Sequence, residues 1–106
     1  MALLIAVYKT PKDKAAFDRH YHETHAPLAK KIPGVKTYEI SNGPVLPGGT
    51  SNVHLVAMLT FDSMAALQAG LGSPEGQAAA GDLANFASGG VDLMMFDTVK
   101  LELTRP

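Results

Sequence analysis

Three of the four histidines of this 106-residue chain fall within the six positions H-Y-H-E-T-H, and a proline follows two residues later. Imidazole can bind a metal, move protons near neutral pH, or sit on a polar surface. On a continuous α-helix, residues five apart project about 140° from one another, so His20 and His25 should point in different directions. The run from His22 to His25 is also one residue shorter than the H-E-x-x-H pattern of zinc proteases. We therefore expect no metal site here, because zinc needs three or four converging ligands.

The helix that carries these histidines should bury one of its faces. Its aromatic and apolar members recur with the i, i+4, i+8, i+11 spacing of a single face, namely Phe17, Tyr21, His25 and Leu28. His25 is therefore expected to point inward, whereas His22 shares its side with charged residues and should face solvent. Two roles stay open for His25: a core histidine bonded to a backbone carbonyl, or a group that transfers protons at a ligand site.

Pro27 should disturb this helix, because proline lacks an N–H group and clashes with the preceding turn. It should also push Ala26 away from helical geometry, so that the helix kinks or restarts there. Carbonyl groups near Glu23 would then lose their helical partners, which would make the inward side polar enough for a small ligand or a water molecule.

Few other groups bring chemistry to the interior. Tyr38, His54 and Asp82 could lie near an internal cavity. Each also has a purely structural reading: Tyr38 as amphipathic packing, His54 as a residue of a subunit interface, and Asp82 as a surface charge. The chain contains no G-x-S-x-G elbow, phosphate loop or dinucleotide fingerprint, so we expect neither covalent serine catalysis nor a nucleotide cofactor.

The secondary structure expected around these residues is an alternation of strands and helices. We expect strands at 3–8, 35–40, 53–61 and 93–103, a helix from a Thr10 cap, a helix after Ser63, and a helix from Ser73 to about Ala87. A loop over 41–52, rich in glycine and proline, should join the two middle strands. This order is the split βαβ pattern of an α+β, ferredoxin-like antiparallel sheet with its helices on one face.

The first and third of these strands are apolar on both faces. In the first, Leu3, Ile5 and Val7 alternate with a second apolar set. Helices on one side leave the other side uncovered. We therefore expect a second copy of the chain to pack on that face, giving a homodimer.

Composition narrows the class of protein further. With 46% hydrophobic residues and no cysteine, residues 1–106 are expected to form one domain without disulfides, thiolate catalysis or iron–sulfur ligation. A net charge of −1 with scattered basic residues indicates neither a nucleic-acid nor a membrane partner. The apolar start is too short to span a bilayer and lacks the features of a secretory leader, so we expect a cytoplasmic protein.

Several stretches together resemble the EthD family, named from ethyl tert-butyl ether degradation. They are Y-K-T-P-K-D, F-D-R-H-Y-H-E-T-H-A-P-L-A-K-K-I-P-G-V, L-T-F-D-S-M-A-A-L, S-P-E-G and D-L-A-N-F. The resemblance implies a dimeric α+β barrel with a pocket between sheet and helices in each subunit. It also implies kinship with cofactor-free monooxygenases, cyclases and lactone isomerases, although Leu59 stands where such isomerases place a cysteine.

Carried onto this chain, the resemblance singles out His25, Tyr38 and Asp82. We predict His25 and Tyr38 as catalytic residues, and Phe17, Tyr21, Leu28 and Asp82 as substrate-binding residues. The expected function is cofactor-independent oxidation or isomerisation (or cyclisation) of a small oxygenated metabolite in catabolism. The alternative is a non-catalytic protein that binds such a metabolite or assists an oxidase.

Overall fold

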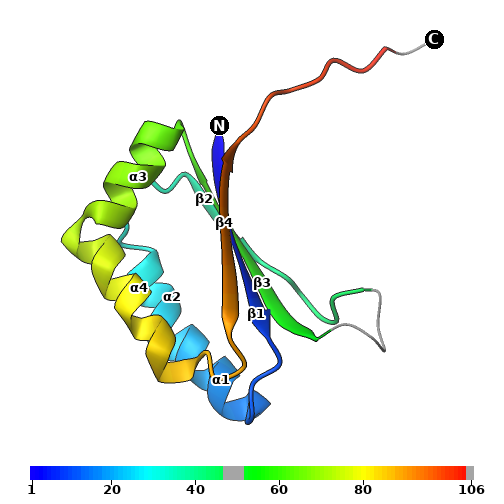
Figure 1. The fold of residues 1–106 in the computed structure, drawn as a ribbon, viewed down its shortest axis with the longest axis vertical. Helices are drawn as coiled ribbons and strands as arrows, with labels where there is room; N and C mark the ends of the chain where they lie inside the picture. The colour runs from blue at the N-terminus through cyan, green and yellow to red at the C-terminus, as the bar shows by residue number, and fades with distance from the viewer. Residues whose placement is uncertain (47–51, 105–106) are drawn as a thin grey trace.

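The computed structural model describes residues 1–46 and 52–104. In chain order its elements are β1 (Ala2–Lys9), α1 (Lys14–His20), the π-helical turn η1 (Tyr21–His25), α2 (Ala26–Ala29), β2 (Thr37–Ile40), β3 (Val53–Phe61), α3 (Met64–Gly72), α4 (Pro74–Phe86) and β4 (Val91–Asp97). The strands form an antiparallel sheet in the order β2-β3-β1-β4, and the helices all cover one face of it (Figure 1). The expected ferredoxin-like α+β fold is confirmed.

The first helix begins later than the expected Thr10 cap. The Thr10 N–H donates to the Asn52 carbonyl, 2.9 Å away, so this residue still belongs to the end of the sheet. Asp13 is the N-cap instead, and its carboxylate accepts a 3.0 Å hydrogen bond from the Ala16 N–H. The helix therefore starts at Lys14, because the cap that satisfies its free N–H groups stands at Asp13.

The second helical region begins where the sequence indicates. Ser63 caps α3 by accepting from the Ala66 N–H, and Ser73 caps α4 by accepting from the Gly76 N–H, each at 3.0 Å. A side chain at Gly76 would overlap the Gly70 carbonyl, so the sharp junction between α3 and α4 requires glycine there.

The sheet has two chemically different faces, as the alternation in β1 predicts. Its helix-covered residues, among them Leu4 and Tyr8, are buried, whereas Leu3, Ile5 and Val7 on the opposite face are only half-buried. The register adds further apolar residues to this helix-free face, which comprises Leu3, Ile5, Val7, Val56, Met58, Met94 and Phe96.

The last strand is shorter than the predicted 93–103. Thr98 still donates its N–H to the Met1 carbonyl at 2.9 Å, but β1 starts at Ala2, so β4 has no partner strand beyond this point. The chain then leaves the sheet (Figure 1), and Val99 and Leu101 are 81% and 77% exposed. The strand ends because its hydrogen-bonding partner ends.

The strand β3 spans Val53–Phe61, which are the bounds predicted from the sequence. The short strand β2 begins at Thr37 rather than 35, although Lys36 donates one further backbone bond of 2.7 Å to Thr60. Part of the predicted loop over 41–52 lies outside the described residues.

Over the two ranges that the structure describes, no helix is long and apolar enough to cross a membrane.

Candidate functional site

The histidine segment is not a continuous α-helix. The Ala26 N–H donates to the Tyr21 carbonyl five residues earlier, and Pro27 has no N–H with which to continue the α-helical pattern. The result is one wider π-helical turn, and such turns bring residues five apart toward the same side. Ala26 itself keeps helical geometry, with φ −59° and ψ −43°, so the predicted departure at this residue is wrong. The backbone absorbs the proline by widening the turn before it.

The widened turn brings His20 and His25 together on one carboxylate. His25 Nδ1 lies 3.1 Å from Asp82 Oδ2, and His20 Nε2 lies 2.9 and 3.0 Å from the two carboxylate oxygens. Asn85 Nδ2 donates to Oδ1 at 2.9 Å. The prediction that His20 and His25 diverge is therefore wrong, whereas His22 is exposed as expected.

Asp82 is ionised in this cluster. Burial disfavours its charge, but the hydrogen bonds from Asn85, His20 and His25 outweigh that effect and place the pKa of Asp82 below its usual range. A carboxylate can only accept, so His25 donates through its Nδ1–H. When His25 is neutral, its Nε2 atom therefore carries the free lone pair.

The Nε2 atom of His25 faces Tyr8. The two atoms are 3.4 Å apart, a long separation at which the Tyr8 hydroxyl can donate only a weak bond. Burial lowers the pKa of His25, the hydrogen bond and charge of Asp82 raise it, and the charge of His20 lowers it, with a net decrease. His25 is thus held neutral near pH 7, with a basic nitrogen that has no strong partner.

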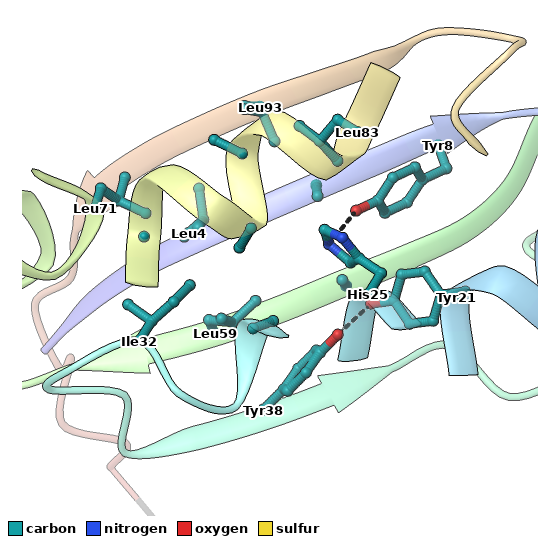
Figure 2. Close-up of a pocket in the computed structure, with 16 residues that line it drawn as sticks. Leu4, Tyr8, Tyr21, His25, Ile32, Tyr38, Leu59, Leu71, Leu83 and Leu93 are labelled. Atoms are coloured by element: carbon teal, nitrogen blue, oxygen red, sulfur yellow. Dashed lines mark hydrogen bonds between the residues drawn. The ribbon is translucent and has the colours of Figure 1, made fainter. Parts of the chain in front are cut away.

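A second polar contact joins two phenols. The hydroxyl groups of Tyr21 and Tyr38 are 2.5 Å apart, and Figure 2 shows both rings converging from η1 and β2. Burial, followed by the hydrogen bond with Tyr38, raises the pKa of Tyr21. Burial also raises the pKa of Tyr38, although its bond with Tyr21 opposes the shift. Burial again is the largest cause that raises the pKa of Tyr8. All three phenols therefore stay protonated and can donate hydrogen bonds.

These polar groups line one end of a cavity of about 120 Å³ between the sheet and α4 (Figure 2). Tyr8, Tyr21, His25 and Tyr38 form the polar end. The remaining lining is apolar: Leu4, Ala6, Ala29, Ile32, Ala57, Leu59, Leu71, Gly76, Ala79, Ala80, Leu83 and Leu93. A small molecule with one oxygen-bearing end and an apolar body matches this division.

The predicted site residues occupy three different environments. His25, Tyr38 and Tyr21 line the cavity, and Asp82 stands behind His25. Phe17 packs in the aromatic core, with its ring centroid 5.4 Å from that of Tyr8. Leu28 is half-buried against the core, and neither it nor Phe17 lines the cavity. The predicted roles of all six residues in binding or catalysis stay predictions.

Sequence reasoning missed two members of the cluster. The first is Tyr8, which follows the apolar residues of the predicted strand 3–8. A tyrosine at the end of a buried face carries a hydroxyl that needs a polar partner, and this was the signal in the sequence for a polar group at the site. For His20, continuous α-helical geometry predicts a direction about 140° away from His25, and this geometry does not hold here. The signal for its true direction was Pro27, which removes an N–H one turn later.

The remaining histidine, His54, turns toward α1. A register shift between β1 and β3 accompanies this position, and His54 Nε2 lies 2.7 Å from Asp18 Oδ1. Its ring packs edge-on against Phe17, 4.8 Å away. Within the residues that the structure describes, no group of three or more His, Cys, Asp or Glu side chains is placed to hold a metal ion.

Sequence comparison relates the chain to one family. The EthD domain matches residues 9–90. An uncharacterised 11.0 kDa protein from the thcB–thcC intergenic region of Rhodococcus erythropolis is 45% identical over 91 residues, which cover 86% of this chain and 88% of that protein. The crystal structure of an ethyl tert-butyl ether degradation (EthD) family protein from Bacillus halodurans is 37% identical, with a TM-score of 0.86, over 93% of this chain and 99% of that one.

More distant structures share the fold alone. A dimeric ferredoxin-like protein of unknown function from Thermobifida fusca has a TM-score of 0.67 at 17% identity, over 92% of each chain. SnoaB, a cofactor-independent oxygenase from Streptomyces nogalater, has a TM-score of 0.66 at 15% identity, over 94% of each chain. The family match covers most of the chain, and the matched residues include the segment with the three histidines and Pro27. This chain belongs to the EthD family.

Proposed function

We propose that the cavity binds a small oxygenated organic metabolite and that His25 transfers a proton to and from it without a bound cofactor. The observation that supports this proposal is the arrangement of His25. An ionised carboxylate holds its Nδ1–H, and its Nε2 lies 3.4 Å from the Tyr8 hydroxyl at the polar end of a mostly apolar cavity lined by three phenols. A base near neutral pH beside hydrogen-bond donors is what proton abstraction next to a carbonyl requires.

The size of the cavity suggests the size of the ligand. Its volume of about 120 Å³ is close to the roughly 150 Å³ in which an engineered protein cavity holds benzene. The proposed ligand is therefore a compound with about one six-membered ring and one carbonyl or related oxygen. Its oxygen would lie at the tyrosine end, and its ring would lie among the leucine and alanine side chains.

The proposed reaction begins when His25 Nε2 takes a proton from the carbon beside the carbonyl. The carbonyl oxygen gains negative charge, and a hydroxyl of Tyr38 or Tyr8 donates a hydrogen bond to it. Asp82 stabilises the imidazolium that forms. Return of the same proton to another carbon completes an isomerisation. If dioxygen adds to the carbanion instead, a C–O bond forms and a proton from the imidazolium completes a hydroperoxide. Loss of water from this hydroperoxide breaks the O–O bond and leaves a new carbonyl group, so that dioxygen is the oxidant and its second oxygen atom leaves as water.

Solvent deuterium exchange tests the proton transfer directly. Cyclic monoketones and enones of one ring would be incubated with the protein in D2O, and exchange at the carbons beside the carbonyl would be followed by NMR. We expect exchange with the parent protein and its loss in His25→Gln, which keeps a hydrogen-bond donor but cannot cycle a proton near neutral pH. The control is His22→Gln, an exposed position on the same turn. Undiminished exchange in His25→Gln would refute the proposed base.

A second candidate function is binding without turnover, as in a metabolite carrier or an accessory protein of an oxidase. The observation that favours it is the Tyr8 hydroxyl 3.4 Å from His25 Nε2, which partly covers the basic atom. Native mass spectrometry of the purified protein would identify a co-purified ligand. A ligand that binds tightly and leaves chemically unchanged after prolonged incubation would support this second function over the first.

We also propose that the functional unit is a homodimer. On the helix-free face, Met94 and Phe96 are 46% and 42% exposed next to the half-buried Ile5. So continuous an apolar surface is unusual on a monomer. A second copy offers the same apolar face, and a symmetric contact would bury both. The dimeric structure with the same fold supports this assembly.

A further inference from the structure

His20 has no place in the proton transfer proposed above, yet it shares the carboxylate that orients the base. Asp82 Oδ2 lies 3.1 Å from His25 Nδ1 and 3.0 Å from His20 Nε2. The side chains of His25 and Asp82 are 7% and 5% exposed, whereas that of His20 is 28% exposed. The three groups therefore form a continuous connection between the cavity and the outside of the helical layer.

The outer end of this connection opens on a surface groove. His20 lines the groove together with Lys12 and Asp13 from the segment before α1, and with Asn85 from α4. Protons from solvent therefore reach His20 without passing through the cavity. His25, by contrast, is enclosed by Tyr8, Tyr21 and the ring of Phe86, which lies 4.8 Å away.

Rigid packing fixes the relation between the two imidazoles. The ring of Phe86 stacks on His20 at a centroid separation of 5.1 Å and also contacts His25. Asn85 holds the remaining side of the carboxylate at 2.9 Å. With these contacts, His25 cannot turn away from Asp82 without losing a buried hydrogen bond, and His20 cannot turn away without losing a partly buried one.

We propose that His20 is a positioning residue for His25 and acts through the carboxylate that they share. The inference deepens the proposed function and rests on it for the role of His25 as a base. Two imidazoles divide the hydrogen-bonding capacity and the negative charge of a single aspartate. When His20 takes a proton from the groove, it binds the carboxylate more strongly, and less of that charge is left to stabilise the imidazolium of His25. The site would thus be tuned from the solvent side.

The residues packed around His25 determine which other titratable groups can affect its protonation. Tyr8 from β1, Tyr21 from η1 and Asp82 from α4 are the titratable groups in contact with His25, and Tyr38 from β2 lies beyond Tyr21. The phenols stay neutral around pH 7 because burial raises the pKa of each. Asp82 is therefore the charged group in contact with His25 in this pH range, and His20 acts on His25 through that carboxylate.

NMR of histidine-labelled protein tests the coupling without any ligand or turnover. Nitrogen shifts should report His25 as the Nδ1–H tautomer, and its titration should follow the protonation of His20 as well as its own. Removing the competitor in His20→Ala frees Asp82 for His25 and removes the charge that His20 contributes, so the pKa of His25 should rise. His20→Gln keeps a donor to Asp82 without a charge and should give a smaller rise.

The control variant is His22→Ala, which alters an exposed histidine of the same segment and should leave the His25 titration unchanged. If a substrate is found, the acidic limb of the rate profile should move to higher pH in His20→Ala, because the base must be unprotonated. An unchanged His25 pKa in both His20 variants would overturn the inference and leave the proposed function standing. A shifted pKa in a protein without proton-exchange activity would support the coupling and reject the proposed function.

Discussion

His25 and Asp82 are 57 residues apart in the chain, and the imidazole Nδ1–H donates to the carboxylate Oδ2 across 3.1 Å. The bond joins the π-helical turn to the middle of α4, and both side chains are buried. It places the proton of the neutral imidazole on Nδ1 and leaves the lone pair on Nε2, the atom near the Tyr8 hydroxyl. The same contact therefore contributes to the packing of the helical layer and to the chemistry proposed for the site.

Asp82→Asn should lower the free energy of unfolding by about 1 to 3 kcal/mol, because an amide cannot accept bonds from His20, His25 and Asn85 as the carboxylate does. Urea denaturation followed by circular dichroism measures the change. The matched control is Glu75→Gln, an exposed carboxylate in the first turn of the same helix, for which a few tenths of a kcal/mol are expected. Equal effects of the two changes would contradict a structural role for the cluster.

Acid should destabilise the folded protein partly through His25. Its pKa in the folded state is lowered, chiefly by burial, so between that pKa and the unfolded value near 6.5 the unfolded chain binds more protons. Stability from neutral His25 is thus present above pH 6.5 and is lost as the pH falls, with a slope of at most about 1.4 kcal/mol per pH unit for one proton. Melting temperatures from pH 7.5 to 5 should fall less in His25→Gln than in the parent. Parallel pH profiles would argue against a buried neutral imidazole.

The two phenolic contacts should differ in strength. Tyr38→Phe removes the 2.5 Å bond with Tyr21 and should cost about 1 kcal/mol, the usual net value of a hydrogen bond. Tyr8→Phe removes only the 3.4 Å contact with His25 and should cost less. Chemical denaturation of both variants tests the order. A larger loss in Tyr8→Phe would show that its hydroxyl has a stronger role than the distance indicates.

Light scattering should give a mass of about twice the 11.2 kDa chain at micromolar concentration, if a second copy covers the helix-free face. Met94→Glu places a charge on that face and should shift the protein to a monomer or unfold it. Ala78→Glu is the control, because it adds the same charge at an exposed position of α4 on the helical side. A stable monomer of the parent protein, or a dimer unaffected by Met94→Glu, would contradict the assembly.

The order of elements could be predicted from the sequence because its signals are local. Alternation in residues 3–8 and 53–61, together with serine caps at Ser63 and Ser73, reflects side-chain direction and N–H satisfaction within a few residues. These local signals failed where hydrogen-bonding partners from distant parts of the chain decide where a helix or strand begins or ends. The first helix starts after Asp13 because Thr10 pairs with Asn52, and β4 stops near Thr98 because its neighbour β1 begins at Ala2.

In the candidate site, too, local signals predicted part of the arrangement and contacts between distant segments decided the rest. The sequence by itself determined that His25 turns inward, since the aromatic spacing of Phe17 and Tyr21 is a property of one helix. Only the tertiary structure decided that His20 joins it. That outcome depends on a turn widened ahead of Pro27 and on a carboxylate that α4 brings from 57 residues away in the chain. Helical periodicity describes only which residues of one helix share a face. A buried carboxylate needs hydrogen-bond donors, and these come from whichever elements pack within hydrogen-bonding distance of it.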